Sequence, residues 1–440
     1  MHLLNAQSGF IEDRTQAVDL DQQPAPIIIL SAADSDNALL TQAQHRLKKS
    51  SPKAPDLRLA NIGQISHPLS VDLYIEKTCA FAKIIIVRLL GGTNYWQYLV
   101  DELSALKKTK LVFLPGDHEF DEILADRSTV SREHWQLFFD YFVAGGLQNS
   151  IQLLKLAACL SGYSTGYKPP KPLKQAGVYL DGEIIEHFED IKCPHHNPVF
   201  ISFYRALVQS NDTETIDHLI KKLRMHKMDP IAFFCHSLKD PKNLNIANYL
   251  IKKFKPKLGI ATTGFALSKP GINAMPEPWS LIKGPVFQFV MSTQMQQSWK
   301  RSTQAMPPRD LAMHIALPEI DGRILIRAIA FKKPTLRDKL TQTSITKMKP
   351  QSERIDWSLR LAKNWLKLQN KKEKDRKIAI MLAHYPSKQS RIGNGVGLDT
   401  PQSVIHCIQH MRQHGYVIRD FPFKNGDQLI RALSKLPHSA

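Results

Sequence analysis

The chain of 440 residues is longer than one ordinary hydrophobic core requires, and it suits two or three domains. It carries 59 Lys and Arg against 40 Asp and Glu, which gives a formal charge of +19. Because the basic residues are spread along the chain, this charge favours a solvated basic surface or an acidic ligand over nucleic acid. No apolar run approaches the roughly 18 residues of a membrane span, residues 1–16 lack a signal-peptide pattern, and five scattered cysteines favour reduced thiols, so we expect a cytoplasmic protein without membrane contact.

The first 125 residues alternate between strand and helix signals. Apolar runs predict strands at 26–30, 83–87 and 110–114, and helical spacing predicts helices at 34–47 and from Asn94, as N-cap, to Leu106. Alternation of this kind is typical of a parallel, doubly wound sheet. We therefore expect an N-terminal α/β domain over residues 1–125.

A helical segment and connector are expected over residues 126–197, with helices within 131–159 and an irregular stretch at 168–197. A second α/β domain is expected over 198–338. Its predicted helices are 214–225 and 243–254, and its predicted strands are 199–203, 231–235, 258–262, 285–291, 312–317 and 324–330.

The remaining residues, 339–440, predict a polar linker (339–352), an amphipathic helix (352–368) and a truncated α/β unit. That unit consists of predicted strands 378–382 and 416–418 and predicted helices 403–414 and 427–436. The chain as a whole is therefore expected to be an α/β protein, in which alternating strand-helix units form Rossmann-like parallel sheets in two or three domains.

Glycines at 393, 395 and 397, with Asp420 after the next predicted strand, imitate a dinucleotide-binding fingerprint. The glycines lie far from the preceding strand, however, and Thr400 and Pro401 are typical of an N-cap and first helical residue. A shaped loop beside a ligand cleft is the favoured interpretation. Nothing in the sequence indicates an ATP site on this chain.

Three further motifs could each either bind a ligand or serve only the structure. Cys193, His195 and His196 lie close together, but zinc needs a fuller ligand set, and we predict no metal site. Gly91-Gly92 could cradle an anion or form a turn, and Tyr95 and Trp96 could be core residues or a wall for a planar ligand.

Two carboxylates lie in the segment Pro318–Gly322. Asp321 precedes glycine and could simply form a turn, whereas Glu319 lacks that explanation and is a candidate for acid-base chemistry or for facing a metal.

Several blocks, taken in order, resemble the CobN-type large subunit of ATP-dependent cobaltochelatase, a member of the CobN/magnesium chelatase family. The resemblance runs from Lys83 to the C-terminus, and its main blocks are residues 87–92 with 95–96, 114–117, 203–205, 284–288, 317–323 and 394–401. Thr93-Asn94 and His384 depart from the pattern, and family members are considerably longer.

The resemblance implies a function in cobalamin biosynthesis, where Co²⁺ enters hydrogenobyrinic acid a,c-diamide and forms nitrogen–metal bonds. It implies Co²⁺ as substrate metal, ATP and Mg²⁺ on separate AAA+ ATPase subunits, and a tetrapyrrole held by the large subunit. Insertion needs an apolar slot and a proton acceptor. The expected catalytic residues are Glu319 and Asp321, and the expected substrate-binding residues are Arg88, Tyr95, Trp96, Arg205, Arg323, Asn394 and Asp399.

The chain is expected to be incomplete alone: it could be half of a split subunit whose C-terminal part is a separate chain, a decayed gene product, or a fragment of a longer protein. Whether it is an enzyme stays open at this point. The alternatives are a stand-alone tetrapyrrole-binding module, an inactive remnant, a nucleotide-binding oxidoreductase and a basic nucleic-acid-binding protein.

Overall fold

The computed structural model describes residues 17–435, with gaps at 93–95, 118, 188–190, 192–196, 270, 272–274, 304–305, 335–336, 383–392, 394 and 396. The chain divides into two compact units, Met1–Arg360 and Leu361–Ala440. The finer domain boundaries expected at 125, 197 and 338 stay a prediction. Among the described residues, no helix is both long and apolar enough to span a bilayer.

The first sheet has four parallel strands in the order β2-β1-β3-β4. Its strands form because short apolar runs are buried on both faces, as in helix-covered parallel sheets. They are β1 (Ile27–Ser31), β2 (Leu57–Asn61), β3 (Ile84–Leu89) and β4 (Lys110–Pro115).

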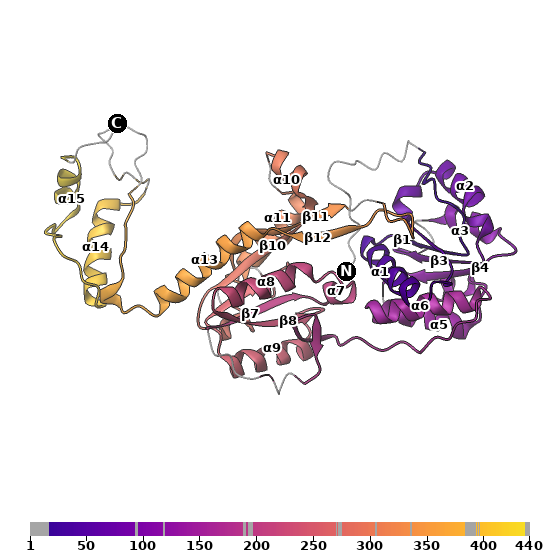
Figure 1. Cartoon of the computed structure of the whole chain (residues 1–440). Coiled ribbons are helices and arrows are strands. Elements are labelled where there is room, and N and C mark those ends of the chain that lie inside the picture. The colour runs from indigo at the N-terminus through magenta and orange to yellow at the C-terminus, as the bar shows by residue number, and fades with distance from the viewer. Residues whose placement is uncertain are drawn as a thin grey trace. The chain divides into compact units, whose positions relative to one another are not determined.

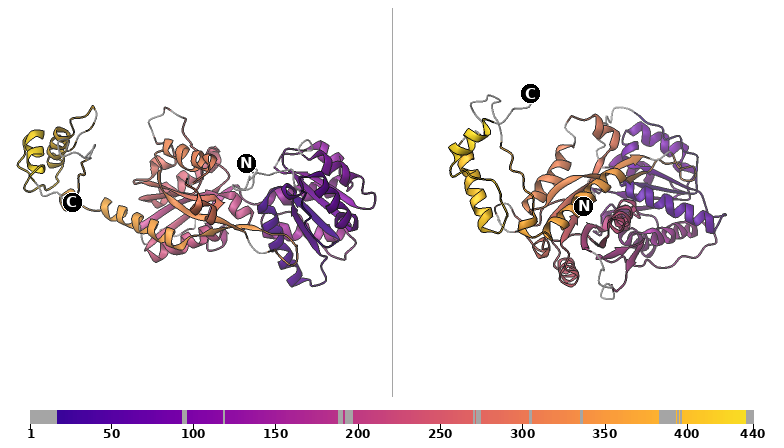
Figure 2. Two further views of the ribbon diagram at one scale, coloured as in Figure 1. Left: turned by 90° about the horizontal axis from the view of Figure 1, so that it is seen from above. Right: turned by 60° about the vertical axis from the view of Figure 1, so that its left-hand side comes forward.

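Helices cover both faces of this sheet (Figure 1, Figure 2). One face packs on α1 (Asp34–Ser50), α5 (Arg132–Ala144) and α6 (Leu147–Leu160). The other packs on α2 (Pro68–Lys77) and α3 (Gln97–Ser104), with α4 (Glu122–Asp126) beside β4. We call the sheet and these helices, residues 17–160, the first lobe.

The second sheet has eight strands in the order β12-β11-β10-β9-β7-β8-β5-β6. The five central strands are parallel and the strands at both edges are antiparallel. The strands are β5 (Ala176–Leu180), β6 (Glu183–Ile185), β7 (Asn197–Tyr204), β8 (Met228–Cys235), β9 (Leu258–Ala261), β10 (Val286–Met295), β11 (Ile324–Pro334) and β12 (Thr346–Pro350).

Residues 176–334 with β12 form the second lobe, in which α7 (Arg205–Gln209) and α8 (Glu214–Met225) follow β7, α9 (Pro241–Phe254) follows β8, and α10 (Gln296–Arg301) follows β10. The predicted α/β fold class, with parallel sheets of alternating strands and helices, is confirmed.

Three local predictions were wrong. Residues 312–317 are helical: α11 (Pro308–Leu311), a π-helical turn (Ala312–Ala316) and α12 (Leu317–Ile320) follow one another. A short apolar run does not by itself distinguish helix from strand. The expected connector at 168–197 contains the β5–β6 hairpin, and the expected linker at 339–352 contains β12, a lysine-bearing edge strand.

The loop after β11 returns to the first lobe and ties the lobes together. The Leu59 amide donates to the Thr341 carbonyl at 3.2 Å, Arg337 donates to the carbonyls of Leu20 and Asp21, and His45 lies 2.6 Å from Asp338. Both lobes therefore belong to one compact unit.

The second unit contains α14 (Thr400–Gln413) and α15 (Gly426–Leu433), and α13 (Ser352–Gln369) spans the division between the units. The strands predicted at 378–382 and 416–418 pair with no described strand. As a result the apolar run 378–382 is exposed, with Met381 93% exposed and Ile378 53% exposed.

Candidate functional site

The carboxyl edge of the first sheet is a topological switch point. The helix after β1 packs on one face of the sheet, and the helix after the neighbouring strand β3 packs on the other. In open α/β sheets the crevice at such a point is where ligands bind. Arg88, near the end of β3, lies beside Ser31, the last residue of β1.

Arg88 is held by groups of the protein itself. Its Nη1 donates to Asp36 Oδ2 at 2.7 Å, its Nη2 donates to the Gly116 carbonyl at 2.9 Å, and its guanidinium lies 4.9 Å from the centre of the Phe142 ring. Ser31 Oγ donates to the same Asp36 oxygen at 2.7 Å. The charge of Arg88 is therefore already balanced, and a ligand carboxylate would compete with Asp36 for it.

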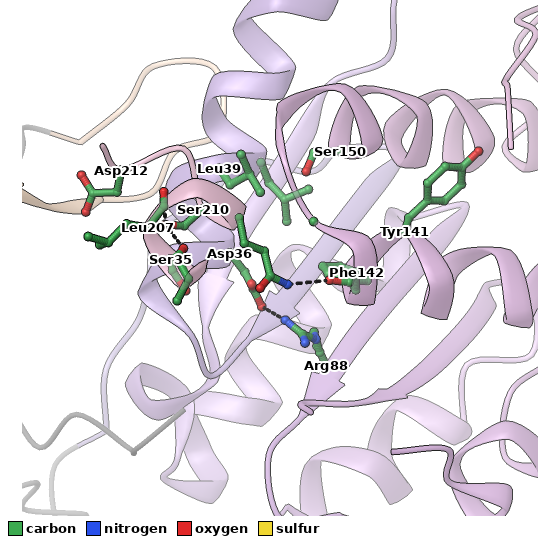
Figure 3. A pocket seen from close by; sticks show the side chains of 14 residues that line it. Ser35, Asp36, Leu39, Arg88, Tyr141, Phe142, Ser150, Leu207, Ser210 and Asp212 are labelled. Carbon is green, nitrogen blue, oxygen red and sulfur yellow. Dashed lines mark hydrogen bonds and ion pairs between the residues drawn. The ribbon is translucent and has the colours of Figure 1, made fainter. Parts of the chain in front are cut away.

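A cavity of about 180 Å³ opens next to this pair. Figure 3 shows Asp36 and Arg88 pointing toward one another on one side, with Leu207, Ser210 and Asp212 across from them. Small-molecule sites usually measure roughly 300–1,000 Å³. This cavity therefore accommodates an edge group of a large ligand but not a whole macrocycle.

The first turn of α1 contains two acids, Asp34 and Asp36, of which Asp36 lines the cavity. Negative side chains at this end complement the helix macrodipole, so the N-terminus of α1 is not free to attract an anion. On the far wall, burial raises the pKa of Asp212, whose Oδ2 accepts from the Met348 amide at 3.2 Å. Burial also lowers the pKa of Lys332, which lies 3.9 Å from Asp34.

Arg205, the first residue of α7, clamps the two lobes, because its Nη2 donates to the Ala144 carbonyl at the end of α5 at 3.5 Å. Its guanidinium donates to the carbonyls of Lys174 at 2.9 Å and Leu173 at 3.1 Å, and to Gln209 Oε1 at 2.9 Å. All these acceptors are neutral, and burial lowers the pKa of Arg205. The arginine therefore connects α7 to the segment that enters the second lobe.

Gln209 completes the clamp at the end of α5. Its Nε2 donates to the Phe142 and Val143 carbonyls at 3.3 and 3.2 Å, and its carbonyl accepts from the Gly146 amide at 2.7 Å. The last carbonyls of a helix have no partner within the helix, and here they find one in the other lobe. Gly145 is required because its φ is +67° and a Cβ there would lie 2.1 Å from Gln209 Cγ.

Asp321 and Arg323 form a second, sealed cluster in the turn that precedes β11, beside the loop that follows β9. The Asp321 carboxylate is fully buried and accepts from the Leu267 and Ser268 amides at 2.9 Å and from Arg323 Nη2 at 3.1 Å. Arg323 Nη1 donates to the Thr263 carbonyl at 2.8 Å and to Gln288 Oε1 at 3.0 Å. The cluster therefore fixes the loop that follows β9.

The other predicted site residues are spread over the chain. Glu319 is exposed on α12 and makes no side-chain hydrogen bond within the part of the chain that the structure describes. Trp96 is half-buried against the first core, Asp399 Oδ1 accepts from the Gln402 amide at 3.0 Å as the N-cap of α14, and Tyr95 and Asn394 lie outside the described residues. Asp399, and not the predicted Thr400, is thus the N-cap.

The predicted residues that the structure describes therefore do not converge on one site. Of these, only Arg88 lines the cavity, and the sequence did not identify Asp36, Gln209 and Asp212, which line it too. Asp36 could have been identified from the sequence as an acidic residue in the first helical turn after the predicted strand β1. Residues Cys193, His195 and His196 lie outside the described residues, and within the described ones no group of three or more His, Cys, Asp and Glu could hold a metal ion.

Comparison with known proteins gives consistent results. Residues 139–439 match the family model described as CobN/Magnesium Chelatase. The aerobic cobaltochelatase subunit CobN of Sinorhizobium sp. is 36% identical over 100% of this chain and 35% of its own length, and the CobN of Pseudomonas aeruginosa is 34% identical over 98% and 35%.

Among solved structures, the catalytic subunit of cobaltochelatase from Mycobacterium tuberculosis aligns with a TM-score of 0.64 and 26% identity. That alignment covers 92% of this chain and 32% of the other. The chain thus spans about a third of the length of the relatives it matches.

Proposed function

The chain belongs to the CobN/magnesium chelatase family, and on that premise we propose that it serves as the N-terminal portion of a cobaltochelatase large subunit, binding the tetrapyrrole for Co²⁺ insertion in cobalamin biosynthesis. The observation that carries the proposal is similarity over the whole chain to proteins named as cobaltochelatase subunits. Because the chain spans 35% of those relatives, it contributes one part of the slot.

The contact with the substrate is proposed at the crevice of the first sheet. The cavity beside Arg88 is too small for the ring and accommodates one peripheral group, such as a carboxylate or an amide. The planar guanidinium of Arg88 can bind a carboxylate through two hydrogen bonds, but only if its ion pair with Asp36 breaks. Arg205 and Arg323 would then act by holding the lobes and loops in position.

The acid-base assignment is proposed for Glu319 first. This carboxylate is exposed and so can reach a proton on a ligand, whereas the buried Asp321 already accepts from three donors, two backbone amides and Arg323. Tyr95, Trp96, Asn394 and Asp399 are retained as proposed contacts to the macrocycle.

A partner polypeptide is proposed to cover the exposed run 378–382. A continuous apolar run with no ladder partner is typical of a parallel strand that belongs inside a sheet. The partner would carry the remaining two thirds of a CobN relative. Ile380→Asp should abolish co-purification with that polypeptide, whereas Ile123→Asp, at a more exposed position on α4, should not. Unchanged co-purification of Ile380→Asp would exclude this surface.

The further partners are AAA+ ATPase subunits, which would bind ATP and Mg²⁺, with Co²⁺ as the substrate metal. We propose that the protein acts in the cytoplasm.

The function is tested by spectral titration of the purified chain with hydrogenobyrinic acid a,c-diamide, followed by addition of the partner polypeptide, the ATPase subunits, ATP, Mg²⁺ and Co²⁺. Saturable binding followed by cobalt insertion is expected. Binding without insertion would indicate a tetrapyrrole-binding module, and absence of binding with and without the partner polypeptide would contradict the proposal.

A further inference from the structure

The exposed face of α14 carries three histidines in a row. His406, His410 and His414 are spaced four residues apart, so they lie one above another on a single helical face, and all three are exposed. Two imidazoles at this spacing can chelate one metal ion. None of these side chains has a function in the tetrapyrrole chemistry proposed above.

His410 and His414 are already close enough to share an ion. Their ring centroids lie 4.3 Å apart with an interplanar angle of 43°. Two metal–nitrogen bonds of about 2.1 Å bring the two ligating nitrogens to roughly 3 Å from one another. A small change in side-chain torsion therefore suffices, and no movement of the backbone is needed.

A hydrogen bond to the helix selects one tautomer of a neutral His414. Its Nδ1 lies 2.9 Å from the His410 carbonyl oxygen, and because a carbonyl only accepts, this nitrogen carries the proton. The lone pair of a neutral His414 therefore lies on Nε2, which faces away from that bond. A ring nitrogen that donates to a backbone carbonyl while the other binds the metal is the usual arrangement of a histidine ligand.

His406 differs from the other two and serves as an internal control. The Gln402 side chain accepts from the Gly426 amide at 3.0 Å through Oε1, so its Nε2 points to His406 Nε2, also at 3.0 Å, and donates to it. The lone pair of His406 is therefore occupied. The chelating pair is His410 with His414.

The position in the helix also favours a cation. His410 lies in the last turn of α14 and His414 is its C-cap residue, where the helix macrodipole is negative. The nearby Arg412 is engaged elsewhere, because its Nη2 donates to the Phe421 carbonyl at 3.2 Å and its guanidinium lies over the Phe421 ring.

We propose that His410 and His414 form a two-histidine site for a first-row divalent transition metal, with water completing the coordination. Among the described residues no His, Cys, Asp or Glu completes a set of three ligands with this pair, so the ion is expected to exchange readily rather than to be a fixed structural metal. Neutral imidazoles suit Co²⁺, Ni²⁺, Cu²⁺ and Zn²⁺, whereas Mg²⁺ requires oxygen ligands. The site would therefore collect cobalt but not magnesium.

The test is a calorimetric titration of the full chain with CoCl₂, without any macrocycle, so that its outcome is independent of the tetrapyrrole proposal. His410→Gln and His414→Gln should each lose one bound Co²⁺ equivalent, and His406→Gln should retain it. MgCl₂ should not compete. Residue-resolved modification of histidines with diethyl pyrocarbonate should show Co²⁺ protecting His410 and His414.

The three substitutions are at exposed positions, so unfolding should not confuse the result. An unchanged Co²⁺ stoichiometry in His410→Gln or His414→Gln, an equal loss in His406→Gln, or displacement of Co²⁺ by Mg²⁺ would each overturn the proposal.

Discussion

Each lobe holds an Arg–Asp pair beside its sheet, Arg88 with Asp36 in the first lobe and Arg323 with Asp321 in the second, and the two pairs differ in what surrounds them. Arg88 and Asp36 border a cavity, and 13% of the Asp36 side chain is exposed. Arg323 and Asp321 are sealed, with exposures of 2% and 0%. An arginine paired with an aspartate beside a parallel sheet can thus border a cavity, as Arg88 does, or only brace a loop, as Arg323 does, and the surrounding residues decide which.

The sealed pair should be the more sensitive to substitution. Asp321→Asn keeps the shape but leaves the Arg323 charge buried without a counter-charge, which should lower the free energy of unfolding by about 3–5 kcal/mol. Denaturant unfolding monitored by circular dichroism measures this change. The exposed Glu319→Gln should stay within about 0.5 kcal/mol of the parent. Equal effects of the two substitutions would mean that the Asp321–Arg323 pair is not sealed.

The open edge depends on the clamp between α5 and α7. Gly145→Ala adds a Cβ at positive φ directly against Gln209, and we expect a loss of about 3 kcal/mol. Gly162→Ala is the matched control, because its φ of +86° is also positive but nothing lies within 4 Å of the added carbon.

Gly162→Ala should therefore cost only about 1 kcal/mol of unfolding free energy. Thermal unfolding of the two variants measures the difference. If Gly145→Ala and Gly162→Ala lose the same unfolding free energy, the contact between Gly145 and Gln209 does not hold the lobes together.

The smallest effect is expected on the far wall of the cavity. Burial raises the pKa of Asp212 above its ordinary value of 3.8, so the folded protein keeps this proton to higher pH than the unfolded chain does. Stability contributed by Asp212 therefore falls as the pH rises through the interval between those two pKa values.

Asp212→Asn should remove this decrease in stability with rising pH, and it should raise the free energy of unfolding at neutral pH by less than about 1 kcal/mol. Unfolding measured from pH 4 to pH 8 tests this expectation, and a steeper decline in the variant than in the parent would contradict it.

The sequence predicted the elements whose pattern is local. Continuous apolar runs identified β1, β3 and β4, and regular spacing identified α1 and α8. Strand β2 was missed because Arg58 interrupts its apolar run, although that side chain is buried and donates to the Gln23 carbonyl at 2.8 Å.

The site was predicted less well because its contacts join distant residues. Arg88 and Asp36 are separated by 52 positions, and Arg205 and Ala144 by 61. The residues after each strand could be read as candidates, but whether their charges were free or already paired depended on the tertiary structure. The predicted strands at 378–382 and 416–418 have no described partner. The sequence could not indicate this, because a strand pattern does not specify the strand with which it pairs.

The most direct test of the account is the affinity of Asp36→Asn for hydrogenobyrinic acid a,c-diamide, measured by spectral titration beside the charge-matched control Glu102→Gln on the opposite face of the first sheet. If a substrate carboxylate approaches Arg88, removing the competing Asp36 charge should tighten binding several-fold, and the control should not change it. Unaltered or weaker binding by Asp36→Asn, in a variant that remains folded, would contradict the proposal that this crevice holds an acidic edge of the tetrapyrrole.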